Sequence, residues 1–227
     1  MPYLKTIVCL ANSFKNGGVC IAGKEKLAHG YGGWVRPVSA RETEEVRPSE
    51  CRYKNGADPK LLDIMHVPLL NAAPHKHQTE NQVIDTEGGW AKVGVLPKSE
   101  LEQIRDRPVS LWIDGSNTRS GGWNNCIGAE QAEEIHDSLV LIRPENLAVA
   151  VRSETREGAI AKKCWTAFRY NGTHYRLRLT DPIVTKAFQA KNEGDYPFED
   201  VYICVSLTGP YKEDGRCHKL VAAVLSA

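Results

Sequence analysis

The dipeptide Asn171-Gly172 constrains the fold more than any other short feature of this sequence. It stands between two runs that alternate apolar and polar residues, KCWTAFRY (163–170) and THYRLRLT (173–180). Asn-Gly between such runs is typical of a two-residue β-hairpin turn, because both residues tolerate the positive φ that the turn requires. The sequence therefore predicts two antiparallel strands joined by a tight turn.

This turn determines which side chains share each face of the hairpin, because it places Tyr170 opposite Thr173 and side chains alternate along a strand. One face is apolar and is predicted to cover a core: Cys164, Thr166, Phe168, Tyr175, Leu177 and Leu179. The other face carries no acid: Trp165, Ala167, Arg169, His174, Arg176 and Arg178. Arginines neutralise phosphates and an aromatic ring can stack on a base. We therefore expect Trp165, Arg169, Arg176 and Arg178 to contact nucleic acid, the alternative being a solvated strand face.

Short apolar runs bounded by turn residues recur along the whole chain and outnumber helical patterns. Further strands are predicted in the first half at 3–11, 19–23, 33–38, 61–70, 81–85 and 109–113. In the second half they are predicted at 138–153 with a bend at Pro144, at 200–207 and at 217–225. Helices are predicted at 99–106 with Ser99 as N-cap, at 129–137, and after Asp181 as N-cap with Pro182 in the first helical position.

The order of elements in the second half is three strands, a helix and two strands. An OB-fold, a small Greek-key barrel that often binds oligonucleotides across its second and third strands, has this order. With 227 residues, the chain has room for two small domains. We expect a boundary near residue 137, with an N-terminal domain at 1–137 that contains an insertion at about 98–136, and a C-terminal domain at 138–227.

The net charge and the cysteine content bear on the partners and on the cellular compartment that can be expected for this protein. The formal net charge is only +1, so binding to a polyanion must depend on local patches. The seven cysteines are odd in number, form no Cys-x-x-Cys pair and lie partly in apolar runs, which indicates reduced thiols rather than a secreted disulfide framework. The N-terminal apolar run is too short for a membrane span and lacks the features of a signal peptide. We expect a cytoplasmic protein without a membrane partner.

The segment PHKHQTENQ (74–82) has no aliphatic side chain, although it follows an apolar strand. Amide side chains read base edges through paired donors and acceptors. We interpret His77, Gln78, Glu80 and Asn81 as a base or nucleotide pocket in the N-terminal half, the alternative being a loop whose polar groups satisfy the backbone.

A metal site in the same segment is a weaker interpretation. His75 and His77 would point the same way on a strand and zinc could use both, with Cys51, His66 or Glu80 as a third ligand. None of these residues has a recognisable ligand spacing, so no cofactor is predicted and zinc at His75 and His77 remains an alternative.

Other polar residues of the N-terminal half are candidates for nucleic-acid contact. Around the Gly17-Gly18 turn these are Asn12, Ser13 and Lys15, and on the strand at 33–38 they are Trp34 and Arg36. A plain hairpin turn explains the glycines equally well. Trp34 could instead lie in the core, with Arg36 paired to Asp63 or Glu80. Near the C-terminus, Lys219 is a further candidate, a solvated edge being the alternative.

A catalytic interpretation of the same region is also open. Cys20 would be the nucleophile, with Glu80 and His77 moving the proton. A buried, inert thiol between Val19 and Ile21 is the competing interpretation.

Five stretches, taken in order, carry a resemblance to a known family: IVCLANSFKNGGVCIAGKE, GGWVRPVS, LLDIMHVPLLNAAPHKHQTEN, FRYNGTHYRLRLTDP and VSLTGPYKEDGRCHKLVAAV. Together they resemble the bacterial dual OB domain family from about residue 4 to 225. The resemblance implies a mainly β protein with a few short helices, built as two tandem OB-like small β-barrels. It also implies nucleic-acid binding in DNA-modification or phage-defence systems.

Three functions follow as expectations. The first is binding of DNA, as a single strand or a modified duplex, alongside proteins of the same operon. The second is an enzyme, a hydratase or hydrolase, that tailors a modified base in DNA, for example by nitrile hydration of a 7-deazaguanine-type base. The third is an adaptor that binds partner proteins through its barrel edges.

Overall fold

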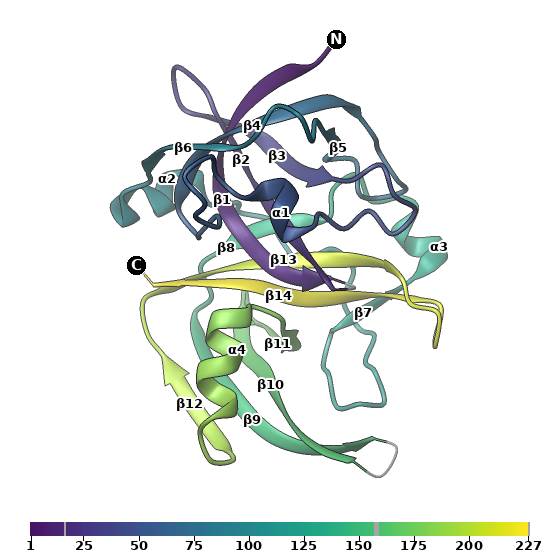
Figure 1. The fold of residues 1–227 in the computed structure, drawn as a ribbon. Helices are drawn as coiled ribbons and strands as arrows, with labels where there is room; N and C mark the ends of the chain where they lie inside the picture. Colours follow the sequence, from purple (N-terminus) through teal and green to yellow (C-terminus); the bar gives the residue numbers. More distant parts are fainter. Residues whose placement is uncertain (16, 157–158, 227) are drawn as a thin grey trace. The chain divides into compact units, whose positions relative to one another are not determined.

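The computed structural model describes residues 1–15, 17–156 and 159–226 (Figure 1). Its contacts divide the chain into two compact units, Met1–Ile104 with His136–Ser138, and Arg105–Ile135 with Leu139–Ala227. No helix in the described residues is long and apolar enough to cross a membrane.

The first unit is a small β-barrel. Its elements are β1 (Tyr3–Lys15), β2 (Gly18–Lys26), β3 (Tyr31–Val38), α1 (Pro48–Cys51), β4 (Asp63–Ala72), β5 (Asn81–Ile84), β6 (Ala91–Val95), η1 (Lys98–Glu100) and α2 (Leu101–Ile104). The sheet runs β1-β2-β3-β5-β4, and β4 also pairs with β1, which closes the barrel. Strands β3 and β5 are parallel, and the helix α1 comes between β3 and β4 in the chain. This is the five-stranded Greek-key barrel of an OB-fold.

The interior of the first barrel follows the alternation of its strands. Met65, Val67 and Leu69 are buried on alternate positions of β4, while β1 contributes Ile7 and Cys9 to the same cluster. Burial of these apolar side chains is the main stabilising contribution to a barrel of this size.

The second unit repeats the same plan. Its elements are β7 (Cys126–Gly128), α3 (Ala129–Ala132), β8 (Leu139–Ile142), β9 (Asn146–Arg156), β10 (Ala159–Tyr170), β11 (Thr173–Leu179), α4 (Pro182–Gln189), β12 (Gly194–Phe198), β13 (Val201–Pro210) and β14 (Arg216–Ser226). The sheet order is β12-β9-β10-β11-β14-β13-β8, with β11 and β14 parallel. Because β8 and β9 are the two halves of one strand bent at Pro144, pairing of β8 with β13 and of β9 with β10 closes this barrel too.

The hairpin prediction is confirmed residue by residue. Tyr170 pairs with Thr173 and Trp165 pairs with Arg178, as the turn requires. Both Asn171 and Gly172 have positive φ, at 47° and 79°. The six side chains expected on the core side are all buried.

The cap of α4 is also confirmed. The Asp181 carboxylate accepts hydrogen bonds from the backbone N–H of Ile183 and Val184, each at 3.0 Å, and Pro182 occupies the first turn. Its other carboxylate oxygen accepts from the Val224 N–H at 3.2 Å, which ties the helix to β14. Burial raises the pKa of Asp181, although these backbone donors act in the opposite direction.

Other local expectations were wrong. Residues 109–113 form no strand, and the helix expected at 129–137 is only the four-residue α3. Ser99 is no N-cap, because a 3₁₀ turn with Pro97 in that position precedes α2. The three strands β6, β7 and β12 were not expected.

Residues 105–135 belong to the second unit and residues 98–104 to the first. The sequence instead suggested an insertion of about 98–136 in the first domain. Leu111 lies in the core of the second barrel. The Tyr170 hydroxyl donates to the Pro108 carbonyl at 2.8 Å, and the Asn171 amide donates to the Val109 carbonyl at 3.0 Å. These long-range contacts are invisible in local sequence patterns.

Candidate nucleic-acid interface

Strands β10 and β11 are the second and third strands of the second barrel, the pair through which OB-folds often bind oligonucleotides. The outer face of β9, β10 and β11 is called the ribbon face below. Lys163, Arg169 and His174 are exposed on it, and Arg176 and Arg178 are half-buried. The alternation predicted from the turn places all five on this side.

Trp165 lies on the ribbon face but is only 3% exposed, so it differs from the open stacking surface that the sequence suggested. The guanidinium of Arg178 lies 4.3 Å from the centre of its ring, and that of Arg176 lies 5.2 Å from it. The indole N–H donates a 2.8 Å hydrogen bond to Glu154. Two arginines and a carboxylate therefore cover the tryptophan.

The ribbon face also contains acids, which the two-strand pattern could not reveal. Glu154 comes from the neighbouring strand β9 and accepts from Arg178 through both oxygens (Nη1···Oε1 3.1 Å, Nη2···Oε2 2.9 Å). Partial burial would raise the pKa of Glu154, but the hydrogen bonds from Arg178 and Trp165 and the charge of Arg178 outweigh it and lower that pKa. Glu145, just before β9, forms an ion pair with Arg169.

Trp123 belongs to this surface, although the sequence analysis assigned it no role. It is 51% exposed, and the guanidinium of Arg176 lies 6.0 Å from the centre of its ring. Its backbone pairs with that of Arg176 (Trp123 N–H to O 3.2 Å, Arg176 N–H to O 3.0 Å). A tryptophan between two glycines and two asparagines was the available signal.

Lys219 differs from its predicted role, because its side chain is buried inside the second unit. Its ammonium donates to the Ile113 carbonyl at 2.8 Å and to Asp114 at 3.0 Å, and lies 5.3 Å from the ring centre of Tyr175. Burial lowers the pKa of Lys219, although Asp114 opposes the shift. Lys219 thus links β14 to the segment before β7 inside the second unit, and its ammonium is not available at the surface to contact a ligand.

In the first unit, Arg36 and Glu80 form a buried ion pair. The distance between Arg36 Nη2 and Glu80 Oε1 is 3.1 Å, and Arg36 also donates to the Ser138 hydroxyl at 2.9 Å. Ser138 in turn donates to Glu80. This agrees with the alternative in which Arg36 pairs with Glu80, and it occupies the carboxylate that the catalytic interpretation needed as a base.

The other members of the expected base pocket are buried as well. His77 is 1% exposed, Gln78 8% and Asn81 0%. Asn81 pairs with Arg36 in the parallel β3–β5 ladder, so the segment continues the barrel. These side chains form a polar interior in the structure and present no open surface to a base.

The two histidines of the zinc alternative lie in different environments. The side chain of His75 is 61% exposed and its Nδ1 lies 3.0 Å from Glu44, whereas His77 is buried. Lys76 between them has a φ of 54°, which turns the chain and breaks the strand geometry on which the alternative depended. Across the described ranges, no group of three or more His, Cys, Asp or Glu side chains is arranged to hold a metal ion.

The remaining N-terminal candidates are dispersed along the β1–β2 hairpin and β3. The Asn12 amide donates to the Pro59 carbonyl at 2.9 Å, and Ser13 is buried opposite the half-buried Cys20. Trp34 is half-buried with the Lys24 ammonium 5.6 Å from its ring centre. The side chain of Lys15 lies outside the described part of the chain.

Two further observations bear on the first barrel. Among the described residues, no hydrogen bond joins Cys20 to Glu80, the base that the catalytic interpretation pairs with this thiol. The η1–α2 segment also reaches β2 and β3, since Lys24 donates to the Ile104 carbonyl at 2.7 Å and Tyr31 donates to Glu100 at 2.5 Å. The strand pair that would bind a ligand in an OB-fold is therefore partly covered in the first unit.

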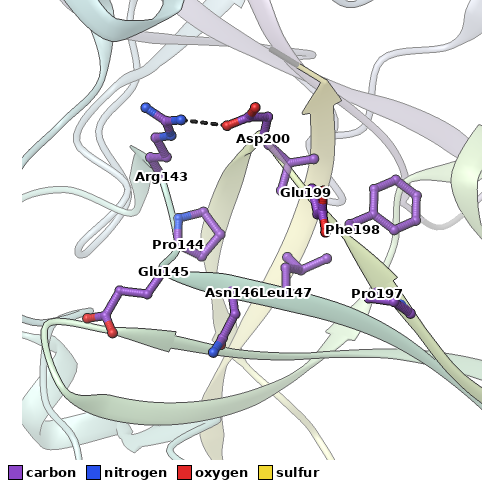
Figure 2. A pocket seen from close by; sticks show the side chains of 10 residues that line it. Arg143, Pro144, Glu145, Asn146, Leu147, Pro197, Phe198, Glu199 and Asp200 are labelled. Carbon is purple, nitrogen blue, oxygen red and sulfur yellow. Dashed lines mark hydrogen bonds and ion pairs between the residues drawn. The ribbon is translucent and has the colours of Figure 1, made fainter.

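A separate pocket of about 370 Å³ lies at the bend between β8 and β9 (Figure 2). Arg143 and Asp200 form a 2.6 Å ion pair at this pocket, and Glu145 and Glu199 also line it. Three acids against one arginine make it unsuitable for a phosphate.

Comparison with known proteins agrees with the topology. Searches of curated proteins and of solved structures gave no match. The family model for the dual OB-containing domain matches residues 5–224. An OB pair of this kind is suited to nucleic-acid binding or a related role. The chain belongs to the dual OB-containing domain family.

Proposed function

We propose that this protein binds nucleic acid, and specifically DNA, across the ribbon face of its second barrel. The observation that carries the proposal is a basic face on the second and third strands of an OB barrel, with Trp165 on β10 and Trp123 on the loop before β7. Lys163, Arg169, Arg176 and Arg178 supply positive charge there, against the acids Glu145 and Glu154.

The charge balance of this face supports the proposal. Arg152 of β9 lies on the same face and pairs with Asp195 of the adjoining β12. Five basic and three acidic side chains then leave an excess of about two positive charges on this surface, where phosphates would be neutralised. The whole chain has a formal net charge of only +1. Positive charge is therefore concentrated locally, which is what a polyanion site requires in a nearly neutral protein.

The choice of DNA and of a bacterial DNA-modification or phage-defence setting comes from the family resemblance. Within that setting, a protein that binds DNA non-covalently would deliver or hold it for other proteins of the system. A catalytic role gains no support from Cys20, Glu80 and His77, since two of these side chains are buried and one of those is in an ion pair.

Equilibrium binding as a function of salt tests the proposal. Fluorescein-labelled oligothymidine of about 16 nucleotides, the upper site size of one OB-fold, is titrated with wild type and with Lys163→Ala, Arg169→Ala and Arg176→Ala. Each variant should weaken binding and reduce the slope of log K against log salt by about one. Arg178 is left unchanged, because it also packs on the ring of the buried Trp165, so its removal would disturb the core as well as the charge.

Lys186→Ala is the matched control, because it removes an exposed positive charge on α4 in the same unit. It should leave the slope close to that of wild type. Absence of wild-type binding at low salt to single-stranded and duplex DNA alike would overturn the proposal, and so would an equal loss in the control and the ribbon variants.

A further inference from the structure

We propose that Trp123 is a stacking site for an unpaired base, so that single-stranded nucleic acid is the substrate class of the ribbon face. This inference rests on the proposed function and makes it more specific. Trp123 lies outside the barrel strands, on the segment between Asp114 and β7, and neither the family match nor the strand pattern assigns it a role.

The first argument is the alternation of arginine and tryptophan side chains. Arg178 lies 4.3 Å from the Trp165 ring centre, and Arg176 lies 5.2 Å from Trp165 and 6.0 Å from Trp123. The inner tryptophan is covered and the outer one is 51% exposed. The series therefore ends in an indole that is open to solvent and can accept one more flat, aromatic group.

The second argument is that the exposed ring is held by a well-bonded loop. Asn124, next to Trp123, donates from its side chain to the His174 carbonyl at 2.9 Å. The Asn125 amide donates to the Thr118 hydroxyl at 2.8 Å and accepts from the Thr118 N–H at 2.9 Å. A loop that is already ordered before binding loses less conformational entropy when a ligand binds, which favours binding.

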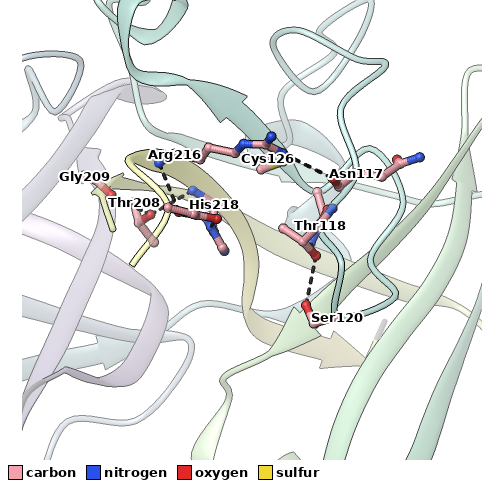
Figure 3. A network of polar contacts seen from close by, with 10 residues as sticks. Asn117, Thr118, Ser120, Cys126, Thr208, Gly209, Arg216 and His218 are labelled. Atoms are coloured by element: carbon pink, nitrogen blue, oxygen red, sulfur yellow. Dashed lines mark hydrogen bonds and ion pairs between the residues drawn. The ribbon is translucent and has the colours of Figure 1, made fainter. Parts of the chain in front are cut away.

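The other end of the loop is anchored as well (Figure 3). Arg216 at the start of β14 donates to the Asn117 carbonyl at 3.2 Å, and the hydroxyls of Thr118 and Ser120 are 2.9 Å apart. Arg119 in the same loop is exposed.

The chemistry of the site selects the strand type. A base in a duplex has both faces covered by its neighbours, so an indole on a fixed loop can stack only on a base that is already unpaired or is turned out of the helix. Stacking needs no particular base, because every base has an aromatic face. The site should therefore favour single strands with little sequence preference.

The test compares Trp123→Ala and Trp123→Phe with wild type on oligothymidine and on the matching oligothymidine–oligoadenine duplex. Trp123→Ala should weaken single-strand binding by roughly 5- to 150-fold, with Trp123→Phe in between. Duplex binding should change little. Ile183→Ala, which trims an exposed apolar side chain on α4, is the control and should bind like wild type.

A second readout protects the test against a folding defect. All variants should keep the wild-type melting temperature within a few degrees, because Trp123 is half exposed and lies outside the core. Oligothymidine should quench the tryptophan fluorescence of wild type more than that of Trp123→Phe. An abasic oligomer should bind wild type and Trp123→Ala equally.

The outcomes separate the two proposals. Wild-type affinity of Trp123→Ala for oligothymidine, with weakened binding by Arg176→Ala and Lys163→Ala, would overturn the stacking site and leave the ribbon face intact. An equal loss on single strand and duplex would also overturn it. Absence of binding by wild type would overturn the proposed function together with this inference.

Discussion

Among single side chains, Glu154 has the greatest influence on the proposed surface. Its carboxylate accepts hydrogen bonds from Nη1 and Nη2 of Arg178 and from the indole N–H of Trp165, as a phosphate would. A phosphate bound at the proposed surface would therefore compete with this internal anion for Arg178. The Glu154 carboxylate holds the Arg178 guanidinium in place when no ligand is bound.

Glu154→Gln should tighten binding to oligothymidine and steepen the salt slope by about one, because it releases the charge of Arg178 while keeping an acceptor for Trp165. The pair is partly exposed, so the melting temperature should change little. Glu134→Gln, which removes an exposed carboxylate from the segment after β7, should have a much smaller effect. Unchanged binding by Glu154→Gln would show that Arg178 contacts no phosphate.

The pH dependence of this effect has a definite sign. The folded state lowers the pKa of Glu154, so the carboxylate stabilises the fold above its unfolded pKa of about 4.3 and loses that contribution as the pH falls through the lower folded value. The gain in oligothymidine affinity of Glu154→Gln over wild type should therefore be constant between about pH 6 and 8, since the wild-type carboxylate stays charged throughout.

Sequence reasoning at the residue scale succeeded where a local rule applies and failed where a distant strand intervenes. The cap by Asp181 follows from a short motif. The burial of Trp165 could not be foreseen, because Glu154 lies on β9 and enters only when β9 pairs with β10. Lys219 likewise faces inward toward Asp114, which is 105 residues earlier in the chain.

At the scale of elements, the loop that carries Trp123 depends on close backbone packing at Gly122. A Cβ at this position would lie 2.0 Å from the Asn125 amide nitrogen. That amide cannot simply move aside, since its two hydrogen bonds to Thr118 hold the loop together. The glycine therefore allows the loop to bring Trp123 against β11.

Gly122→Ala should displace the loop and reduce single-strand affinity in the same direction as Trp123→Ala, with a loss of stability of about 1–3 kcal/mol from overpacking. Thermal melting and oligothymidine titration measure the two effects. Gly209→Ala is the control, because a Cβ there meets no atom within 4 Å. Wild-type affinity in a folded Gly122→Ala protein would argue against a defined loop conformation.

The elements themselves were predictable to different degrees. The hairpin of β10 and β11 followed from one dipeptide, because a two-residue turn sets the register. Strands β6 and β12 were not predicted, because AKVGV and GDYPF are short and contain glycine or proline. Both segments form strands because β6 pairs with β4 and β12 pairs with β9, which outweighs their weak intrinsic preference for the β conformation.

At the scale of the whole molecule, two barrels of the same topology contribute differently. In the first unit, η1 and α2 reach the second and third strands, and the polar residues of the expected pocket are buried. In the second unit, the equivalent strands carry the basic side chains, and the exposed Trp123 lies beside them on the loop before β7. We therefore assign the proposed nucleic-acid contact to the second barrel and a structural role to the buried polar cluster of the first.

The most direct measurement is photo-crosslinking of wild type to oligothymidine that contains 4-thiothymidine, followed by mass spectrometry of the crosslinked peptides. The account predicts crosslinks in residues 114–128 and 159–179, with loss of the first set in Trp123→Ala. Crosslinks confined to residues 1–104 would contradict it.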